Sequence, residues 1–342
     1  MMQRLLSRSI RLALPCMLLL APGLSRAASI DEVVKAFEKD DEYVKPFATF
    51  FGSMTNSGWY QSAAVPRGFS FYIGLPLNAT LISDDDREYT TTWVDKGCVA
   101  YHKDVPGGAN ACRESSKLTA PTLFGKGKGP TTYTSVYDPA SKTIFDSIPT
   151  LHSDGIPEVA AFNWLPFGEP QLGVSYFHTE AKFRYFALPL DIVSVSLPAF
   201  GLQHDFAWAM PNNPVHLSVA ANWSFLTAEW KPGSNIDGSL KLEGTSACYG
   251  LLAGWTWKSW LEVFTEVGWE TSSIKSSGKL TIHDKKKIEA DQVVRPALTL
   301  DGRNGFRMAL NLAFHIGYDA VLGQNFGADL GNQVGLLAYR YK

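Results

Sequence analysis

The chain has 342 residues, with 31 lysines and arginines against 33 aspartates and glutamates, and a formal net charge of −2 at pH 7. This balance excludes the strongly basic surface that nucleic-acid binding requires, so no nucleic-acid partner is expected. Hydrophobic residues make up 45% of the chain, yet no stretch after the N-terminus is apolar for about 18 residues, so no transmembrane helix is predicted.

Residues 1–27 have the pattern of a secretory signal peptide. Arg4, Arg8 and Arg11 precede an apolar run over residues 12–24, and Ser25 and Ala27 follow as the small residues that a signal peptidase reads. The run is too short for a spanning helix and is interrupted by proline. The sequence therefore predicts an exported protein whose mature chain starts near residue 28.

Residues 28–66 are expected to form an N-terminal helix and a plug. The sequence Ser-Ile-Asp-Glu at 29–32 is a capping box that starts a helix, and Pro46 is expected to end it. Residues 47–66 are aromatic and broken by Gly and Ser, which suits a segment lying inside a barrel and lining a ligand site; a periplasmic helix that binds a partner is the alternative. The candidate ligand-binding residues here are Phe47, Phe50, Phe51 and Trp59.

Residues 84–165 are rich in turn residues and are expected to form long extracellular loops. Cys98 and Cys112 bracket a Gly/Pro/Asn-rich stretch at 105–110, and in an oxidising compartment they could form a disulfide. No Cys or His pair stands at ligand spacing, so no metal site is expected, and no cofactor.

Alternation of apolar and polar residues from 67 to 342 predicts an all-β fold, an antiparallel transmembrane β-barrel of about 12–14 strands. Side chains on a strand alternate between two faces, and strands of about 9–13 residues suit a tilted crossing of a bilayer. A soluble sandwich is the alternative, but charge on the polar faces and aromatic residues near strand ends favour the barrel. The apolar set includes Phe69, Phe71, Ile73, Val215, Leu217, Val219, Val263, Val267, Phe306, Met308 and Leu310.

Between residues 242 and 249 the apolar positions change from even to odd numbers, and this switch predicts a β-bulge near Gly244.

Two sets of charged residues share strand faces that should point into the barrel. Charge at membrane depth is tolerated when it is turned inward and paired or hydrated. These residues could line a water-filled channel, or they could pair with one another as structural ladders. The sets are His178, Glu180, Lys182 and Arg184 on one strand, and Glu262, Glu266 and Glu270 on another.

Several segments resemble an uncharacterised family of bacterial outer-membrane proteins that is related to the long-chain fatty-acid transporters of the outer membrane. They are Tyr-Val-Lys-Pro-Phe at 43–47, Gly-Trp-Tyr-Gln-Ser-Ala at 58–63, residues 179–189, Phe-Gly-Leu-Gln-His at 200–204 and Asn-Gly-Phe-Arg at 304–307. The resemblance covers the mature chain except 84–165 and implies a barrel with an N-terminal plug. The Asn-Pro-Ala of the fatty-acid transporters is absent from residues 28–66.

The function expected from these features is passive uptake of small hydrophobic molecules, or a channel for them, in the Gram-negative outer membrane. The expected partners are outer-membrane lipid and lipopolysaccharide, the barrel assembly machinery, and a small hydrophobic ligand. A structural or partner-docking barrel without transport is the alternative. A lipid hydrolase is less favoured: His216 and Ser218 share a strand face as a base and nucleophile could, but that face is opposite to the lipid, so no catalytic residue is assigned.

Overall fold

The computed structural model describes residues 41–341 except 108–111, 152–163, 190–192, 210–212, 232–235, 258–259, 283–291, 295–297, 316–318, 328–330 and 335–337. The expected signal peptide and the expected helix start at Ser29 lie outside the described residues. The chain divides into two units, Met1–Pro46 with Ile82–Phe162 and Phe47–Leu81 with Asn163–Lys342.

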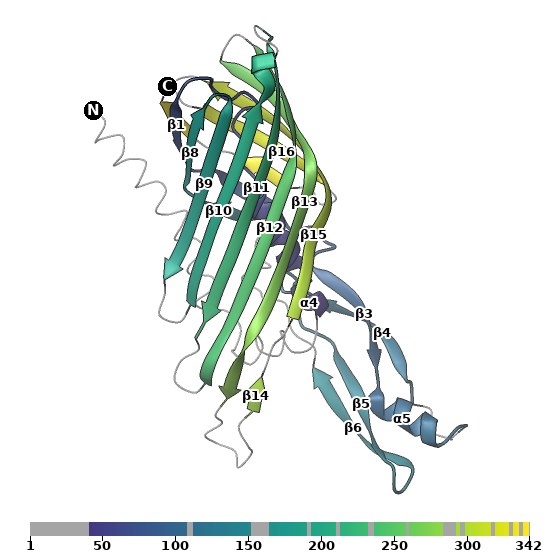
Figure 1. Ribbon diagram of the computed structural model, residues 1–342. Helices are drawn as coiled ribbons and strands as arrows, with labels where there is room; N and C mark the ends of the chain where they lie inside the picture. Colours follow the sequence, from purple (N-terminus) through teal and green to yellow (C-terminus); the bar gives the residue numbers. More distant parts are fainter. Residues whose placement is uncertain are drawn as a thin grey trace. The chain divides into compact units, whose positions relative to one another are not determined.

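The second unit contains an antiparallel sheet of 14 strands, which Figure 1 shows as long, tilted and neighbouring arrows. In chain order these strands are β1 (Ser70–Gly74), β2 (Leu77–Leu81), β7 (Trp164–Gly168), β8 (Gln171–Tyr176), β9 (Thr179–Pro189), β10 (Val193–Asp205), β11 (Val215–Trp230), β12 (Ile236–Trp257), β13 (Leu261–Ile282), β14 (Gln292–Val294), β15 (Leu298–His315), β16 (Asp319–Gly327), β17 (Gly331–Val334) and β18 (Ala338–Tyr341). A short 3-10 helix, η1 (Phe206–Ala209), follows β10.

The strand pairings form a closed ring. Strands β8 to β13 pair in succession, β15 joins β13 to β16, and β18 joins β16 to β1, which pairs back to β8. Among the described residues the sheet contains 14 strand segments, which make fewer crossings of the barrel wall. Short breaks divide some crossings into two strands: β1 and β2, for example, pair with β8 and β7 on one side and with β18 and β17 on the other.

The outward and inward faces of the barrel are reversed relative to a soluble protein. Burial alternates residue by residue along β1, β8 and β9, and the exposed positions are apolar while the buried ones are polar. A continuous apolar surface of this extent is rare on soluble proteins but is required against lipid. The protein is therefore a transmembrane β-barrel with an apolar belt that includes Phe71, Ile73, Leu172, Val174, Phe200, Leu202, Val219, Trp223, Tyr249, Leu251, Met308 and Leu310.

In strand β12 the apolar residues change from even-numbered to odd-numbered positions without a bulge. Its pairing runs in unbroken register through Gly244 on both sides, so the bulge expected there is wrong. Inward positions are even-numbered throughout, from Leu240, which is 4% exposed, to Leu252, which is fully buried. Lys241 and Glu243 point outward and pair with each other, because this part of the strand lies beyond the apolar belt. The pattern reverses where the strand leaves the membrane.

Helix α4 (Asp41–Thr55) continues through Pro46, so the helix end expected at this proline is also wrong. Proline removes one backbone donor and crowds the preceding turn. The residues that follow Pro46 bury one side of the helix: Ala48 is fully buried and Phe51 is 1% exposed. This packing outweighs the local preference for a break. Among the described residues, no helix is long and apolar enough to cross a membrane.

The other unit contains two β-hairpins and a short helix where loops were expected. Strands β3 (Glu88–Val94) and β4 (Ser115–Pro121) form one hairpin, β5 (Thr131–Asp138) and β6 (Thr143–Leu151) form the other, and α5 (Lys96–Asp104) follows β3. Asp95 caps α5, and its carboxylate also accepts from the Ser135 backbone N–H at 3.0 Å. Burial alone would raise the pKa of Asp95. The hydrogen bonds from Ser135, Cys98 and Gly97 have the larger combined effect and hold this pKa below its usual range.

Candidate functional site

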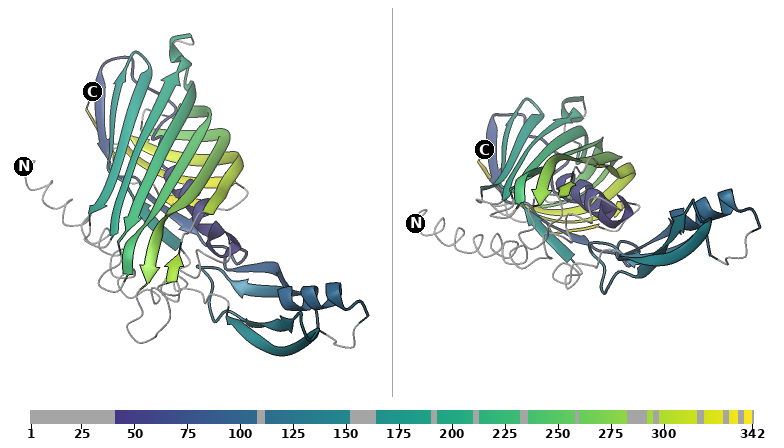
Figure 2. Two further views of the ribbon diagram at one scale, coloured as in Figure 1. Left: turned by 60° about the horizontal axis from the view of Figure 1, so that its bottom comes forward. Right: turned by 90° about the horizontal axis from the view of Figure 1, so that it is seen from below.

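The interior of the barrel is occupied by a segment of the chain that precedes the first strand. We call this segment, residues 47–66, the plug. The end view in Figure 2 shows the purple helix within the ring of strands. The plug fills the space that a channel would need, so it defines the candidate site.

The plug runs along the lumen from the middle of β13 to the turn between β8 and β9. At its start the Ser272 hydroxyl, in the middle of β13, donates to the Ala48 carbonyl at 3.2 Å. At the other end the Val65 carbonyl lies 3.2 Å from His178 Nδ1, in the turn between β8 and β9. We call the first the insert end, because β2 leads from it to residues 82–162, and the second the turn end.

Three cations of the wall bind main-chain carbonyls of the plug. Arg307 donates to the Asn56 carbonyl at 2.8 Å, and Arg184 donates to the Ser57 carbonyl at 2.8 Å. Lys182 donates to the Trp59 carbonyl at 2.8 Å. These carbonyls follow the end of α4, where a helix leaves acceptors unsatisfied and carries partial negative charge. The wall therefore supplies positive donors where the plug has excess acceptors.

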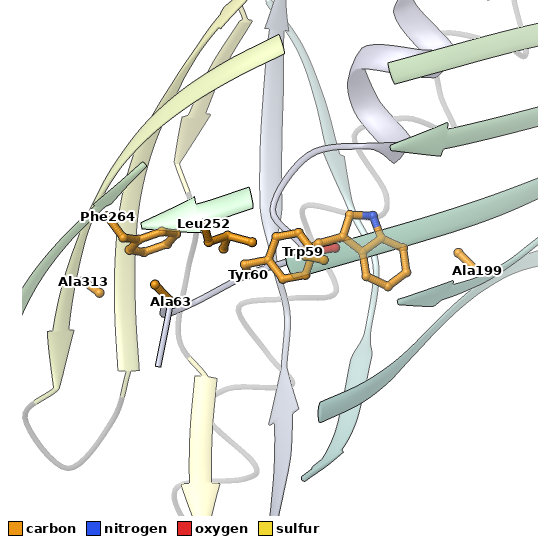
Figure 3. Packing of buried hydrophobic residues seen from close by; sticks show 8 residues of the cluster. Trp59, Tyr60, Ala63, Ala199, Leu252, Phe264 and Ala313 are labelled. Atoms are coloured by element: carbon orange, nitrogen blue, oxygen red, sulfur yellow. The ribbon is translucent and has the colours of Figure 1, made fainter. Parts of the chain in front are cut away.

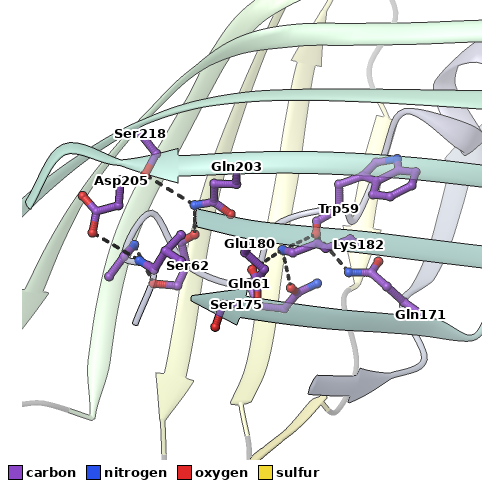
Figure 4. A network of polar contacts seen from close by, with 12 residues as sticks. Trp59, Gln61, Ser62, Gln171, Ser175, Glu180, Lys182, Gln203, Asp205 and Ser218 are labelled. Atoms are coloured by element: carbon purple, nitrogen blue, oxygen red, sulfur yellow. Dashed lines mark hydrogen bonds and ion pairs between the residues drawn. The ribbon is translucent and has the colours of Figure 1, made fainter. Parts of the chain in front are cut away.

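Further along the plug, carboxylates of the wall accept from its donors. Glu262 accepts from the Ser62 hydroxyl at 2.6 Å and from the Ala63 backbone N–H at 2.8 Å. Asp205 accepts from the Val65 N–H at 3.2 Å. Figure 4 shows Asp205 and Gln203 beside this part of the plug, and Gln203 donates to the Ser62 carbonyl at 2.9 Å. Wall side chains thus bind both N–H donors and carbonyl acceptors of the plug backbone.

The same wall residues are paired with one another. Lys182 and Glu180 are 3.0 Å apart, and Arg184 and Glu169 are 3.7 Å apart. Glu270 lies 2.6 Å from Arg303 and 3.4 Å from Arg307, which also reaches Glu266 at 3.9 Å. Buried charges are stable only when paired and hydrogen-bonded. The two columns of charge therefore combine ion pairs within the wall with hydrogen bonds to the plug.

Apolar contacts fix the aromatic residues of the plug. Trp59 is 1% exposed and belongs to a buried cluster with Tyr60, Ala63, Ala199, Ala220, Leu252, Phe264 and Ala313, most of which Figure 3 shows. The guanidinium of Arg184 stacks over the Trp59 ring, 4.1 Å from its centroid.

Glycines of the wall make room for the plug. A Cβ at Gly201 would lie 2.6 Å from Trp59 Cε3, and one at Gly254 would lie 2.8 Å from Ala63 Cβ. A Cβ at Gly244 would lie 3.0 Å from the Phe51 ring. The wall is therefore shaped to this segment.

The structure places most of the residues expected at the site in this lumen. Glu180, Lys182, Arg184, Glu262, Glu266 and Glu270 are all buried inside it, as are Phe51 and Trp59. Phe47 and Phe50 are half-buried. His178 lies in the turn, where its φ of 59° is left-handed, and not on the strand face with Glu180. Phe51 and Trp59 fill the space beside the wall glycines and do not line an open apolar pocket.

Some residues of the site were not found from the sequence. Gln171, Gln203, Asp205 and Arg303 all contact the plug or its ion pairs. Gln203 and Asp205 do alternate on β10 toward the polar face, which is the signal that could have found them. Glu169 stands in the break between β7 and β8, where no alternation marks its direction.

His216 and Ser218 both face the lumen, as expected, but they contact different partners and not each other in a base–nucleophile pair. The Ser218 hydroxyl donates to the Ala63 carbonyl, while His216 Nδ1 lies 3.2 Å from Asp205 Oδ2. Ser218 is fully buried. Both side chains serve contacts at the turn end of the plug.

The model of a family described as "Family of unknown function (DUF6588)" matches residues 7–336, and no curated protein matches. Among solved structures, the translocator domain of the autotransporter NalP from Neisseria meningitidis is 12% identical, covers 87% of this chain and 96% of its own, and has a TM-score of 0.32. OccK8 (OprE) from Pseudomonas aeruginosa is 7% identical, covers 80% and 98%, and has a TM-score of 0.13. Likenesses this distant carry no argument about function.

Proposed function

The chain belongs to this family of unknown function, and we propose that it is an outer-membrane channel held closed by its own plug. In the closed state the lumen is filled by residues 47–66, and solutes pass only when the plug is displaced. The plug contacts described above carry this proposal. They hold residues 47–66 inside the lumen, yet no covalent bond joins the plug to the wall among the described residues.

The character of the contacts supports reversible displacement. Besides the packed rings of Phe51 and Trp59, the plug is attached through hydrogen bonds between wall side chains and its main-chain atoms, and water can replace each of these bonds. A hydrogen bond to a charged group contributes about 1.5–3 kcal/mol net, because its alternative is a bond to water. The polar part of the attachment therefore costs less to break in a hydrated lumen than in a dry one.

The lining supports small polar solutes over the hydrophobic ones expected from the sequence. With the plug moved, the exposed wall would present Glu180, Lys182, Arg184, Gln203 and Glu262, all of which lie on inward faces. A lining of paired charges holds water and offers hydrogen bonds to a polar solute, whereas an apolar molecule would have to leave lipid to enter it.

A removable cross-link tests whether plug movement controls passage. The hydroxyls of Thr55 and Ser246 lie 2.6 Å apart, so the pair Thr55→Cys and Ser246→Cys can form a disulfide between plug and wall. Cys248, which is buried two residues further along β12, is replaced by serine in all samples. Conductance of single barrels in planar bilayers is measured before and after reduction.

The proposal expects openings in the Cys248→Ser background, none in the oxidised cross-linked protein, and recovery after reduction. The background protein under the same reductant controls for loss of the native disulfide. Equal conductance with and without the cross-link would overturn gating by the plug. An absence of openings in the uncross-linked protein, over a range of voltages, would overturn the channel itself.

Partner docking is a second candidate, and one observation favours it. On the hairpins of residues 82–162, Tyr133 is 61% exposed and Phe145 is 66% exposed, and aromatic residues are enriched where proteins bind one another. The candidate predicts that Tyr133→Ser with Phe145→Ser leaves single-barrel conductance intact but reproduces the phenotype of a gene deletion in cells. A wild-type phenotype would exclude it.

A further inference from the structure

Helix α5 and the segment before β4 bring together side chains that the channel does not use. Cys98 Sγ lies 4.0 Å from His102 Nδ1, and Cys112 Sγ lies 3.9 Å from His102 Nε2. His102 Nδ1 is in turn 2.7 Å from a Glu114 carboxylate oxygen. One ligand atom from each of Cys98, His102 and Cys112 can be chosen so that all lie within 4.8 Å of one another. In the structure the two cysteines form a disulfide, with their Cα atoms 5.8 Å apart.

The sequence expectation of no metal site overlooked this group because no helix was expected there. On a helix, residues four apart face the same side, so Cys98 and His102 are neighbours one turn apart. Cys112 and Glu114 come from the strand side of the unit. Their approach depends on the fold and has no recognisable spacing.

We propose that reducing the Cys98–Cys112 disulfide creates a binding site for a thiophilic metal ion, of the Zn²⁺ or Cu⁺ class. Two thiolates and one imidazole are the ligands that such ions prefer. In a tetrahedral zinc site, bond lengths of about 2.3 Å to sulfur and 2.0–2.1 Å to nitrogen put neighbouring S and N ligands roughly 3.6 Å apart. The 3.9 Å from Cys112 Sγ to His102 Nε2 is already close to that value, while Cys98 Sγ lies 4.0 Å from the other ring nitrogen, Nδ1, and has to shift toward Nε2 when the disulfide opens.

Glu114 determines which nitrogen of His102 is available. A carboxylate at Nδ1 holds the proton on that atom and leaves the Nε2 lone pair for the metal. Nε2 is the nitrogen nearest Cys112. Carboxylates that orient a histidine ligand in this way raise its basicity and fix its ring. Glu114 is thus a positioning residue, and the fourth metal position is left to water or another small ligand.

Contacts other than the disulfide also hold the segments that carry the ligands. Asp95 holds the start of α5 through the N–H groups of Gly97 and Cys98, and the Asp95 N–H donates to the Glu114 carbonyl at 2.8 Å. At the other end of α5, the rings of Tyr101 and Tyr137 are in edge contact, with centroids 5.9 Å apart. These contacts fix both ligand-bearing segments, so reduction frees the sulfurs to separate without unfolding the unit.

A dithiol supplies the two electrons that reduce the Cys98–Cys112 disulfide. One thiolate of the dithiol attacks Sγ of Cys112, which is more exposed than the fully buried Cys98, and displaces the Cys98 thiolate. The second thiol then releases Cys112, so the dithiol becomes a disulfide and the protein gains two thiols. Metal binding displaces the two thiol protons. The oxidised and metal-bound forms therefore exclude each other.

Cobalt binding to the full chain in detergent micelles tests the proposal. Co²⁺ takes tetrahedral thiolate sites, and sulfur-to-cobalt charge transfer gives it near-ultraviolet absorbance. The protein is reduced with a phosphine, desalted without oxygen and titrated with Co²⁺. The expected result is one Co²⁺ per reduced chain, displaced by Zn²⁺, and no charge-transfer band for the oxidised chain.

The variants separate the ligands from incidental thiols. Cys248→Ser, which removes the buried barrel cysteine, should leave the band unchanged, while Cys98→Ser with Cys112→Ser should abolish it. Glu114→Gln should weaken binding about 10–100-fold, and His102→Ala should weaken it more. A reduced wild-type chain without the band would overturn the proposal even if every variant failed to fold. So would an undiminished band in the double-serine variant. Conductance is not measured, so the outcome is independent of the channel.

Discussion

At the scale of single residues, the fit between wall and plug depends on positions where a side chain is missing as much as on those where one is present. Gly201 leaves space that the Trp59 ring fills, and the Arg184 guanidinium stacks over that ring. The first contact is steric and the second is electrostatic, and each can be tested alone.

Gly201→Ala should loosen the plug. Its Cβ would lie 2.6 Å from the indole of Trp59, and such overpacking costs about 1–3 kcal/mol. The expected result is a lower unfolding midpoint and more frequent channel openings. Gly305→Ala is the matched control, because a Cβ there meets nothing within 4 Å. Equal behaviour of the two variants would contradict the close fit.

Arg184→Met should destabilise the barrel by about 3–5 kcal/mol, because it leaves the Glu169 carboxylate buried without its counter-charge. The guanidinium is fully buried, and Glu169 is 1% exposed. Adding Glu169→Gln removes the uncompensated charge and should restore part of the loss. The measurement is denaturant unfolding in detergent. A double variant no more stable than the single one would show that the pair is not coupled.

For single residues, the sequence predicts the strand face to which a side chain points but not the group that it contacts. Glu180, Lys182 and Arg184 could be assigned to the lumen because side chains alternate along a strand. Nothing in the sequence pairs Arg307 with Glu270 or Lys182 with the Trp59 carbonyl, because these contacts depend on strand register and on the path of the plug.

At the scale of elements, β12 and β13 are longer than the membrane requires, with 22 residues each, and their chemistry changes along their length. Leu240 and Ile274 are buried inside at the insert end, whereas Glu266 and Glu270 are buried inside further along. Beyond the apolar belt these strands turn apolar residues inward and polar residues outward, as in a soluble protein. A sequence reading that assumes one rule for the whole strand interprets this change as a bulge.

Position along β13 should therefore decide the cost of a charge on its outer face. Val267→Arg should cost about 2–4 kcal/mol if the residue lies near the bilayer midplane. Ser277→Arg, on the same face but beyond the belt, should cost almost nothing, since Ser277 is exposed and follows the exposed Lys275. Unfolding of both variants in lipid vesicles measures the difference, and equal costs would contradict the placement of the membrane boundary.

The cap of α5 gives a prediction for the hairpin unit. Asp95→Ala removes acceptors for the N–H groups of Gly97, Cys98 and Ser135, and loss of an N-cap costs about 0.5–2 kcal/mol. Amide exchange should accelerate in α5 and β5 but not in the barrel. Asp85→Ala, at an exposed position in the turn before β3, is the control. Unchanged exchange in α5 would contradict the capping role.

Local patterns were least reliable where tertiary packing competes with them. The helix continues through Pro46 because the residues after it are buried, and residues 84–151 form hairpins although turn residues are frequent among them. Alternation in β3 to β6 is weak, since a thin two-stranded hairpin exposes most of both faces, and it could not be separated from loop.

At the scale of the whole molecule, the barrel depends on one seam. Strand β18 pairs with β1 over Phe71–Gly74, and among the described residues one residue pair joins β18 to β16. Removing residues 338–342 should leave β1 with an unpaired edge in lipid, which is strongly disfavoured. The expected result is loss of the heat-modifiable band in detergent gels. A folded barrel after this truncation would contradict the closure through β18.

A ring with its own chain inside it also imposes an order of events. The plug precedes the first strand in the chain, whereas the ring closes only when β18 pairs with β1. The plug must therefore be held between unfinished walls until that pairing forms, or be drawn afterwards through a ring already closed. The wall glycines and the plug carbonyls offer contacts that can form before closure. The segment that obstructs the finished lumen therefore also serves as a template against which the strands assemble.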